Sequence, residues 1–119
     1  RLDTALVVRD PAGLLFADRV RLAVGPGADL RYRALGLAEG RDYVATVVIV
    51  GAPDPVGLAR ACAAGPGRAV VAAAPLARRG AVVRILAADA PELLEAVEAV
   101  WARARAACLG LPPLALRKP

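Results

Sequence analysis

The stretch AVVRILAADAPELLEAVEAVWARARAACLG, residues 81–110, predicts a strand that leads into a long helix. Its first six residues are mostly apolar and β-branched, as is typical of a strand. Asp89 and Glu92 then have the spacing of a capping box, in which both side chains accept hydrogen bonds from the backbone at the start of a helix. Gly110 stands where a left-handed C-terminal cap belongs. We therefore predict a helix over Ala90–Leu109.

One side of this helix is expected to face the core. At helical spacing, one stripe collects six residues: Leu93, Val97, Val100, Trp101, Ala104 and Cys108. Trp101 is predicted to lie in the core because its indole removes a large apolar area from water. The alternative is a contact with a protein partner, since Trp and Arg are frequent in such contacts and Arg105 lies one turn away. The glutamates at 92, 95 and 98 are interpreted as a solvated acidic face.

The first part of the chain predicts a β-hairpin. Residues 4–9 are apolar and β-branched, residues 10–13 (DPAG) have the composition of a turn, and a second strand covers residues 14–22. Asp18 interrupts the apolar face of that strand, so we expect it at an edge or a bulge. A short extended piece is predicted at residues 29–35.

Between the hairpin and the long helix, the sequence predicts a strand, a helix and two further strands. Residues 43–50 (YVATVVIV) predict a strand that is apolar on both faces in its second half, and thus a central one. Asp54 and Pro55 begin a helix that ends at Ala64, with Leu58, Ala61 and Cys62 on its inner side. Two strands follow, at residues 69–74 and 81–86, joined by Arg78-Arg79-Gly80; Arg84 in the second is either an edge residue or half of a buried pair.

This order predicts an α+β, β-rich fold: a mixed, mainly antiparallel sheet with two helices, made of a β-hairpin region followed by β-α-β-β-α. The chain has 119 residues, which suits a single domain or a piece of a larger one.

The residue inventory argues against an enzyme made by this chain alone. There is no His, Ser, Asn, Gln or Met, so neither a hydrolase triad nor a His-activated thiol can form. Cys62 and Cys108 are interpreted as structural thiols, and two Cys without His do not make a metal-site signature. We predict no catalytic, cofactor-binding or metal-binding residues.

Charge and hydropathy limit which partners and which location are expected for this protein. Basic residues exceed acidic ones by five, but the arginines are scattered and few aromatic side chains accompany them, so we expect no nucleic-acid binding. The longest apolar run, residues 43–50, is far shorter than the roughly 20 residues that cross a bilayer. With no leader of the secretory kind after Arg1, we expect a soluble, cytoplasmic protein.

Several stretches together resemble the C-terminal part of the UreD (UreH) family of urease accessory proteins. They are the closing segments VRIL (83–86), WARAR (101–105) and LGLP (109–112), with RD, LL and DR in the hairpin and YVATV (43–47) after a glycine loop, in the order found in that family. Family members are about twice as long, and they tend to end differently from the Arg117-Lys118-Pro119 of this chain.

The resemblance implies a β-rich scaffold with two helices. It implies contacts with UreF-like and UreG-like accessory proteins and with apo-urease, so that nickel reaches the urease active site. In the family, the nickel route is thought to pass through the interior of the scaffold. Four acids could line such a polar passage, although each is better explained as a turn or surface residue: Asp18, Asp29, Glu39 and Asp42. A second hypothesis interprets the β-α-β-β-α pattern as a ferredoxin-like regulatory module that binds a small molecule.

Overall fold

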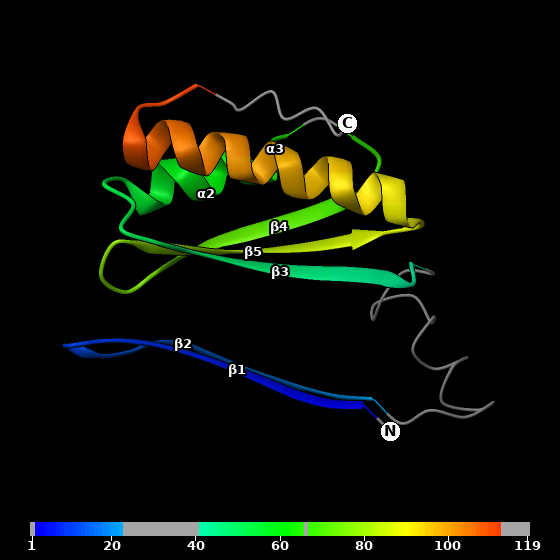
Figure 1. The fold of residues 1–119 in the computed structure, drawn as a ribbon, viewed down its shortest axis with the longest axis horizontal. Coiled ribbons are helices and arrows are strands. Elements are labelled where there is room, and N and C mark those ends of the chain that lie inside the picture. Colours follow the sequence, from blue (N-terminus) through cyan, green and yellow to red (C-terminus); the bar gives the residue numbers. More distant parts are fainter. Residues whose placement is uncertain (1, 23–40, 66, 113–119) are drawn as a thin grey trace, which may run out of the picture. The chain divides into compact units, whose positions relative to one another are not determined.

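The fold is described from a computed structural model, which covers residues 2–22, 41–65 and 67–112. Contacts divide the chain into two compact units, Arg1–Asp42 and Tyr43–Pro119. Each unit has its own antiparallel sheet, drawn in Figure 1. The predicted extended piece at 29–35 lies outside the described residues.

The first unit contains the predicted hairpin. Strands β1 (Leu2–Asp10) and β2 (Gly13–Leu22) pair antiparallel. At the turn, the Ala12 N–H donates to Asp10 Oδ1 at 2.9 Å, and Gly13 has a φ of 130° that favours glycine. The register shifts at Leu15, which has no Cα partner and is buried. Leu15 is therefore the bulge residue. Asp18 of β2 pairs with Leu6, and β2 has a single partner strand among the described residues, so of the two predicted alternatives the edge position holds for Asp18.

The second unit is built on a three-stranded sheet of order β3-β5-β4, with every pair antiparallel. Its strands are β3 (Tyr43–Val50), β4 (Val70–Leu76) and β5 (Gly80–Ala87). Within the described part of the chain β3 pairs with β5 alone, so the prediction that β3 is central is wrong. The central strand is β5, which is hydrogen-bonded on both sides.

Side-chain burial follows this order. Ala81, Val83, Ile85 and Ala87 alternate along β5 and are all 0% exposed. Arg84 points to the other face and is exposed, between Thr46 and Ala72 of the neighbouring strands. Arg84 is thus neither on an edge strand nor part of a buried pair. A period of two in an antiparallel sheet that is covered on one face explains both observations.

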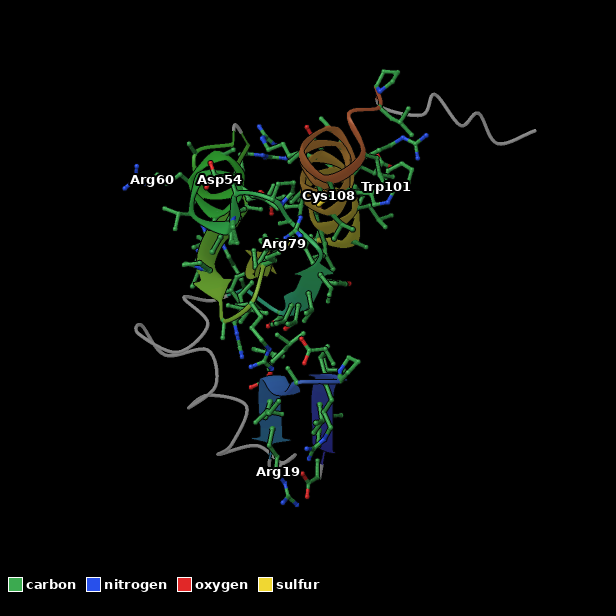
Figure 2. All side chains as sticks on the ribbon, turned by 90° about the vertical axis from the view of Figure 1, so that its left-hand side faces the viewer. Arg19, Asp54, Arg60, Arg79, Trp101 and Cys108 are labelled. Atoms are coloured by element: carbon green, nitrogen blue, oxygen red, sulfur yellow. The ribbon has the colours of Figure 1, made fainter. Side chains whose placement is uncertain are left out.

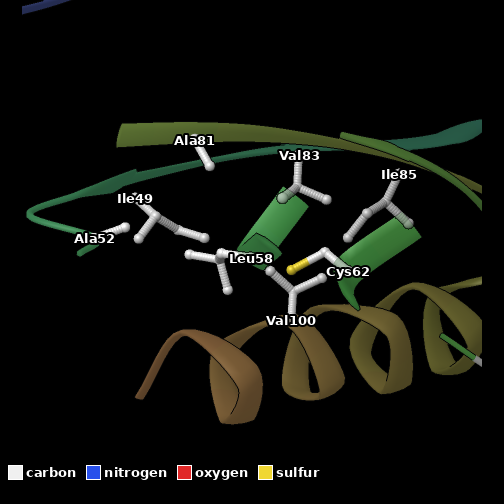
Figure 3. Close-up of a cluster of buried hydrophobic side chains, with 8 residues drawn as sticks. All are labelled: Ile49, Ala52, Leu58, Cys62, Ala81, Val83, Ile85 and Val100. Atoms are coloured by element: carbon white, nitrogen blue, oxygen red, sulfur yellow. The ribbon is translucent and has the colours of Figure 1, made fainter. Parts of the chain in front are cut away.

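Both helices cover the same face of this sheet (Figure 1). Helix α2 (Pro55–Ala63) contacts β4 and β5, whereas α3 (Ala90–Leu109) contacts β3 and β5. The core lies between the layers, where Ile85, Val83, Val100 and Cys62 are almost fully buried (Figure 3).

The helix ends have the predicted caps. Asp54 Oδ1 accepts from the Gly57 N–H at 3.1 Å, and Asp89 Oδ1 accepts from the Glu92 N–H at 2.8 Å. Gly110 closes α3 in the left-handed conformation. On α2 the buried residues are Leu58, Ala59 and Cys62, while Ala61 is exposed. The buried side of α2 is thus rotated relative to the predicted one, so that Ala59 is buried in place of Ala61. The reason is that α2 packs against α3 as well as against the sheet.

The prediction of a β-rich α+β fold with two helices is confirmed. In the second unit, β3-α2-β4-β5-α3 with strand order β3-β5-β4 forms a split β-α-β, the arrangement of the first five elements of a ferredoxin-like fold. In that fold a fourth strand pairs with the outer edge of the strand equivalent to β3. No helix among the described residues combines the length and apolar character needed to span a membrane.

Candidate functional site

A small cleft of about 20 Å³ lies between the end of α2, the start of β4 and α3. Its polar wall includes Glu92, whose side chain is 9% exposed. Glu92 Oε2 accepts from the Ala88 N–H at 2.7 Å, one residue before the N-cap Asp89, in a variant of the capping box. Glu92 Oε1 lies 3.8 Å from Nε of the exposed Arg68. Glu92 is therefore a buried capping residue. Its assignment to a solvated face with Glu95 and Glu98 is wrong for Glu92 and correct for the other two, which are exposed.

Cys62 and Arg103 also line this cleft. Cys62 is a free thiol that is 2% exposed. Burial raises the pKa of the Cys62 thiol, and the positive charge of Arg103 opposes this shift. Arg103 Nη1 donates to the Ala99 carbonyl at 3.2 Å, and a Cβ at Gly65 would lie 3.2 Å from its guanidinium nitrogens. At neutral pH the thiol is protonated, and so it is a poor nucleophile and metal ligand.

The volume limits what this cleft can hold. A cavity needs roughly 10–15 Å³ to hold one water molecule. A space of about 20 Å³ accepts a water molecule and is too small for a metabolite. We interpret the cleft as a packing defect between α2 and α3 with polar walls.

The acids considered for a polar passage are not brought together in the described structure. Asp18 lies on β2 opposite Leu6, and Asp42 directly precedes β3. Asp29 and Glu39 lie outside the described residues. Across residues 2–22, 41–65 and 67–112, no three His, Cys, Asp or Glu side chains are grouped to hold a metal ion.

The exposed side of α3 carries the most distinctive surface of the second unit. Trp101 is 45% exposed, Leu94 is 61% exposed and Leu109 is 64% exposed. The prediction that Trp101 lies in the core is wrong. At roughly 100° per residue, Trp101 is rotated by more than a quarter turn from the neighbouring Val100, which takes the central core position. We call Leu94, Glu98, Trp101, Arg105 and Leu109, which share this side of the helix, the outer stripe.

Arg105 contacts the indole of Trp101. Its guanidinium carbon lies 5.7 Å from the centroid of the indole, within the range of a cation–π contact, and its Nε donates to the Pro112 carbonyl at 3.0 Å. Figure 2 shows Trp101 on the side of α3 that faces away from α2. The residues that line the cleft toward α2, such as Ala99 and Arg103, are on the opposite side of the helix. The predicted stripe of six residues covers a wider arc of α3 than the arc that is buried in the structure. This width already indicated that some residue of the stripe would be exposed.

The face of the sheet opposite to the helices, the outer sheet face, is also apolar. Val44 is 48% exposed and Val50 is 55% exposed. The alternation and register add Val48, Val70, Leu76, Val82, Arg84 and Leu86 to this face. The described part of the chain thus exposes apolar side chains both on the outer stripe and on the outer sheet face.

Comparison with known proteins decides the family. The family model for the UreD urease accessory protein matches residues 1–119. This chain belongs to the UreD family. The resemblance seen in the sequence is confirmed over the whole chain.

One curated UreD relative shows how much of a family protein this chain represents. Urease accessory protein UreD 1 of Pseudomonas syringae pv. tomato is 37% identical over 120 residues. The match covers 95% of this chain and 41% of that protein, so the UreD-family chain spans less than half of the relative. No solved structure matches the chain.

Proposed function

We propose that this chain acts in urease maturation, as the C-terminal part of a cytoplasmic UreD scaffold that assists nickel insertion into apo-urease. It does so through protein–protein contacts with UreF-like and UreG-like accessory proteins and with apo-urease itself. The observation that carries this proposal is the match of the urease accessory family to residues 1–119. The role is that of a scaffold and not of an enzyme.

The surface chemistry supports a binding role. The cleft contains a capping carboxylate and a protonated thiol, neither of which is arranged to transfer a proton or to attack a substrate. In contrast, the outer sheet face exposes valines such as Val44 and Val50 that a partner protein covers favourably. Burial of apolar surface stabilises such contacts by about 25 cal/mol per Å².

The alternative, a small-molecule-binding module, agrees with the topology of the second unit, but the cleft found among the described residues does not suit a ligand of that kind. The split β-α-β of the second unit agrees with the ferredoxin-like hypothesis. A drug-sized ligand, however, occupies a pocket of roughly 300–1,000 Å³. The cleft between α2 and α3 is far smaller. We therefore prefer the scaffold.

A urease-producing host that lacks its own UreD-family protein tests this proposal. The protein that carries residues 1–119 is expressed with an affinity tag, beside the UreF-like, UreG-like and urease proteins. We expect the tagged protein to co-purify with the UreF-like protein and with apo-urease, and the nickel content of urease to rise above that of the empty-vector control. Neither co-purification nor a gain in nickel, with all proteins expressed, would refute the scaffold role.

A further inference from the structure

An arginine of α3 lies against the end of α2. Arg103 is part-buried, and its Nη1 donates to the Ala99 carbonyl one turn earlier. A Cβ built on Gly65, the residue after the C-cap of α2, would lie 3.2 Å from both Nη atoms of Arg103 and 3.3 Å from its Cζ. Since three guanidinium atoms are nearly equidistant from one point, the guanidinium turns its face toward Gly65.

The absence of a side chain at residue 65 permits this close approach. The φ of Gly65 lies outside the left-handed region, so backbone conformation is not the reason for a glycine at this position. Nonbonded carbon atoms are normally separated by roughly 3.5–4.0 Å. A side chain at residue 65 would therefore displace the guanidinium of Arg103 from the end of α2.

The end of α2 is also a favourable place for a positive charge. The last carbonyls of a helix give its C-terminus a partial negative charge. The carbonyls of Arg60 and Cys62 accept from the backbone at 3.0 and 3.4 Å in this last turn. A guanidinium beside Gly65 thus adds an electrostatic attraction to the packing of α2 on α3.

Cys62 lies where this contact holds the two helices together. It is the next-to-last residue of α2, it is 2% exposed, and it lines the same cleft as Arg103. Figure 3 shows its side chain between the sheet and α3, beside Val100. Movement of the end of α2 away from α3 would therefore widen the cleft and expose the thiol.

Helix α2 depends on such contacts for its position. It has nine residues, fewer than the about 12–15 that make an isolated helix even marginally stable in water. Elements of this kind open locally at a lower free energy than the strands of the core.

We infer that Arg103 is a latch between the two helices. Its guanidinium is anchored on α3, lies on Gly65, holds the end of α2 closed and keeps the Cys62 thiol inaccessible. Release of the latch opens the end of α2 while the three-stranded sheet stays folded. The fold thus contains a thiol that reacts only in an open state of α2.

The rate at which Cys62 is alkylated measures this open state. The protein that carries residues 1–119 is treated with N-ethylmaleimide while folded, and mass spectrometry follows the peptide that contains Cys62, so that other cysteines do not interfere. R103A is expected to raise the rate at Cys62 about tenfold or more. The half-buried Cys108 is the internal reference, and its rate is expected to stay unchanged.

The direction of this effect separates access from chemical reactivity. The positive charge of Arg103 favours the thiolate of Cys62, which is the form that reacts. Loss of that charge alone would therefore slow the alkylation. A faster reaction in R103A reports access to the thiol, and an unchanged or slower reaction would overturn the latch.

G65A tests the contact while the charge of Arg103 is retained. The new Cβ displaces the guanidinium, so Cys62 is expected to react faster than in the parent and more slowly than in R103A. Because both substitutions break the same contact, the double variant G65A/R103A is expected to react no faster than R103A. Rates that multiply in the double variant would show two independent causes and would overturn the contact.

R68A is the matched control for the loss of a cation from this cleft. Arg68 lines the same cleft, but its side chain is 87% exposed. R68A is expected to leave the rate at Cys62 within about twofold of the parent. An equal effect of R68A and R103A would assign the result to charge alone and overturn the inference.

Hydrogen exchange in the same protein separates local opening from a loss of folding. In R103A the amides at the end of α2 are expected to exchange faster, whereas those of the central strand β5 are expected to exchange as in the parent. Faster exchange along β5 as well would show that the whole unit is destabilised, and it would overturn the latch.

Discussion

Glu92 Oε2 accepts a hydrogen bond from the Ala88 N–H at 2.7 Å, so a nearly buried carboxylate holds the chain segment that joins β5 to α3. The backbone of Glu92 is also hydrogen-bonded, because the Asp89 side chain accepts from the Glu92 N–H. The two hydrogen bonds fix where α3 begins relative to the end of the central strand. They thereby determine which residues of α3 face the sheet.

Replacement of Glu92 by Ala is expected to destabilise the chain by about 1.5–3 kcal/mol, the usual loss for a hydrogen bond to a charged group. The measurement is chemical denaturation followed by circular dichroism. E95A and E98A serve as controls, because both side chains are exposed, and each is expected to stay within about 0.5 kcal/mol of the parent. Equal losses in E92A and E95A would show that the capping box contributes nothing.

The connection between β4 and β5 is predicted to be strained. Arg78 and Arg79 have φ values of 56° and 64°, in the left-handed region that costs a non-glycine residue roughly 1–2 kcal/mol. R79G is expected to raise the thermal midpoint because glycine adopts this conformation without a steric penalty. The hydrogen bond from the Ala52 N–H to the carbonyl of residue 79 is retained, since it involves only the backbone. R60G, in the middle of α2, is the control and is expected to lower the midpoint.

Stability in alkali is predicted to depend on Cys62. Burial raises the pKa of this thiol in the folded chain above that in the unfolded chain. Its contribution to stability is therefore fully present below the unfolded pKa, about 8.5, and is lost as the pH rises through the folded pKa. The free energy of unfolding is expected to fall more steeply above about pH 8.5 in the parent than in C62A. Parallel curves for the two proteins would contradict this.

Adjacent valines on β5 test which face of the sheet is covered. Val83 is 0% exposed beneath the helices, whereas Val82 is half-buried on the outer sheet face. V83A removes two buried carbon atoms and is expected to cost about 1.6 kcal/mol for lost burial plus a contribution from the cavity that remains. V82A is expected to cost clearly less. Urea denaturation of both variants measures the difference, and a larger loss in V82A would reverse the assignment of the faces.

The amino-acid sequence by itself determined the local structure. The turn at Asp10–Gly13, the caps Asp54 and Asp89, and the stop at Gly110 each depend on a hydrogen bond or a φ angle within a few residues, so their positions follow from residue type. The two helices and most strands of the described residues consequently lie within two residues of their predicted bounds. The family was also readable, because the order of short segments along the chain is a property of the sequence.

Only the tertiary structure decided the order of the strands and the direction that each side chain faces. A strand that is apolar on both faces, such as β3, is equally suited to the centre of a sheet or to an edge covered by another chain. Trp101 and Val100 are neighbours, and the angle at which α3 lies on the sheet determined that Val100 is buried and Trp101 exposed. Glu92 likewise does not belong to the solvated acidic face, because its side chain accepts the Ala88 N–H of the β5–α3 connection. These outcomes depend on contacts between distant segments, and a local pattern does not contain the free energy of those contacts.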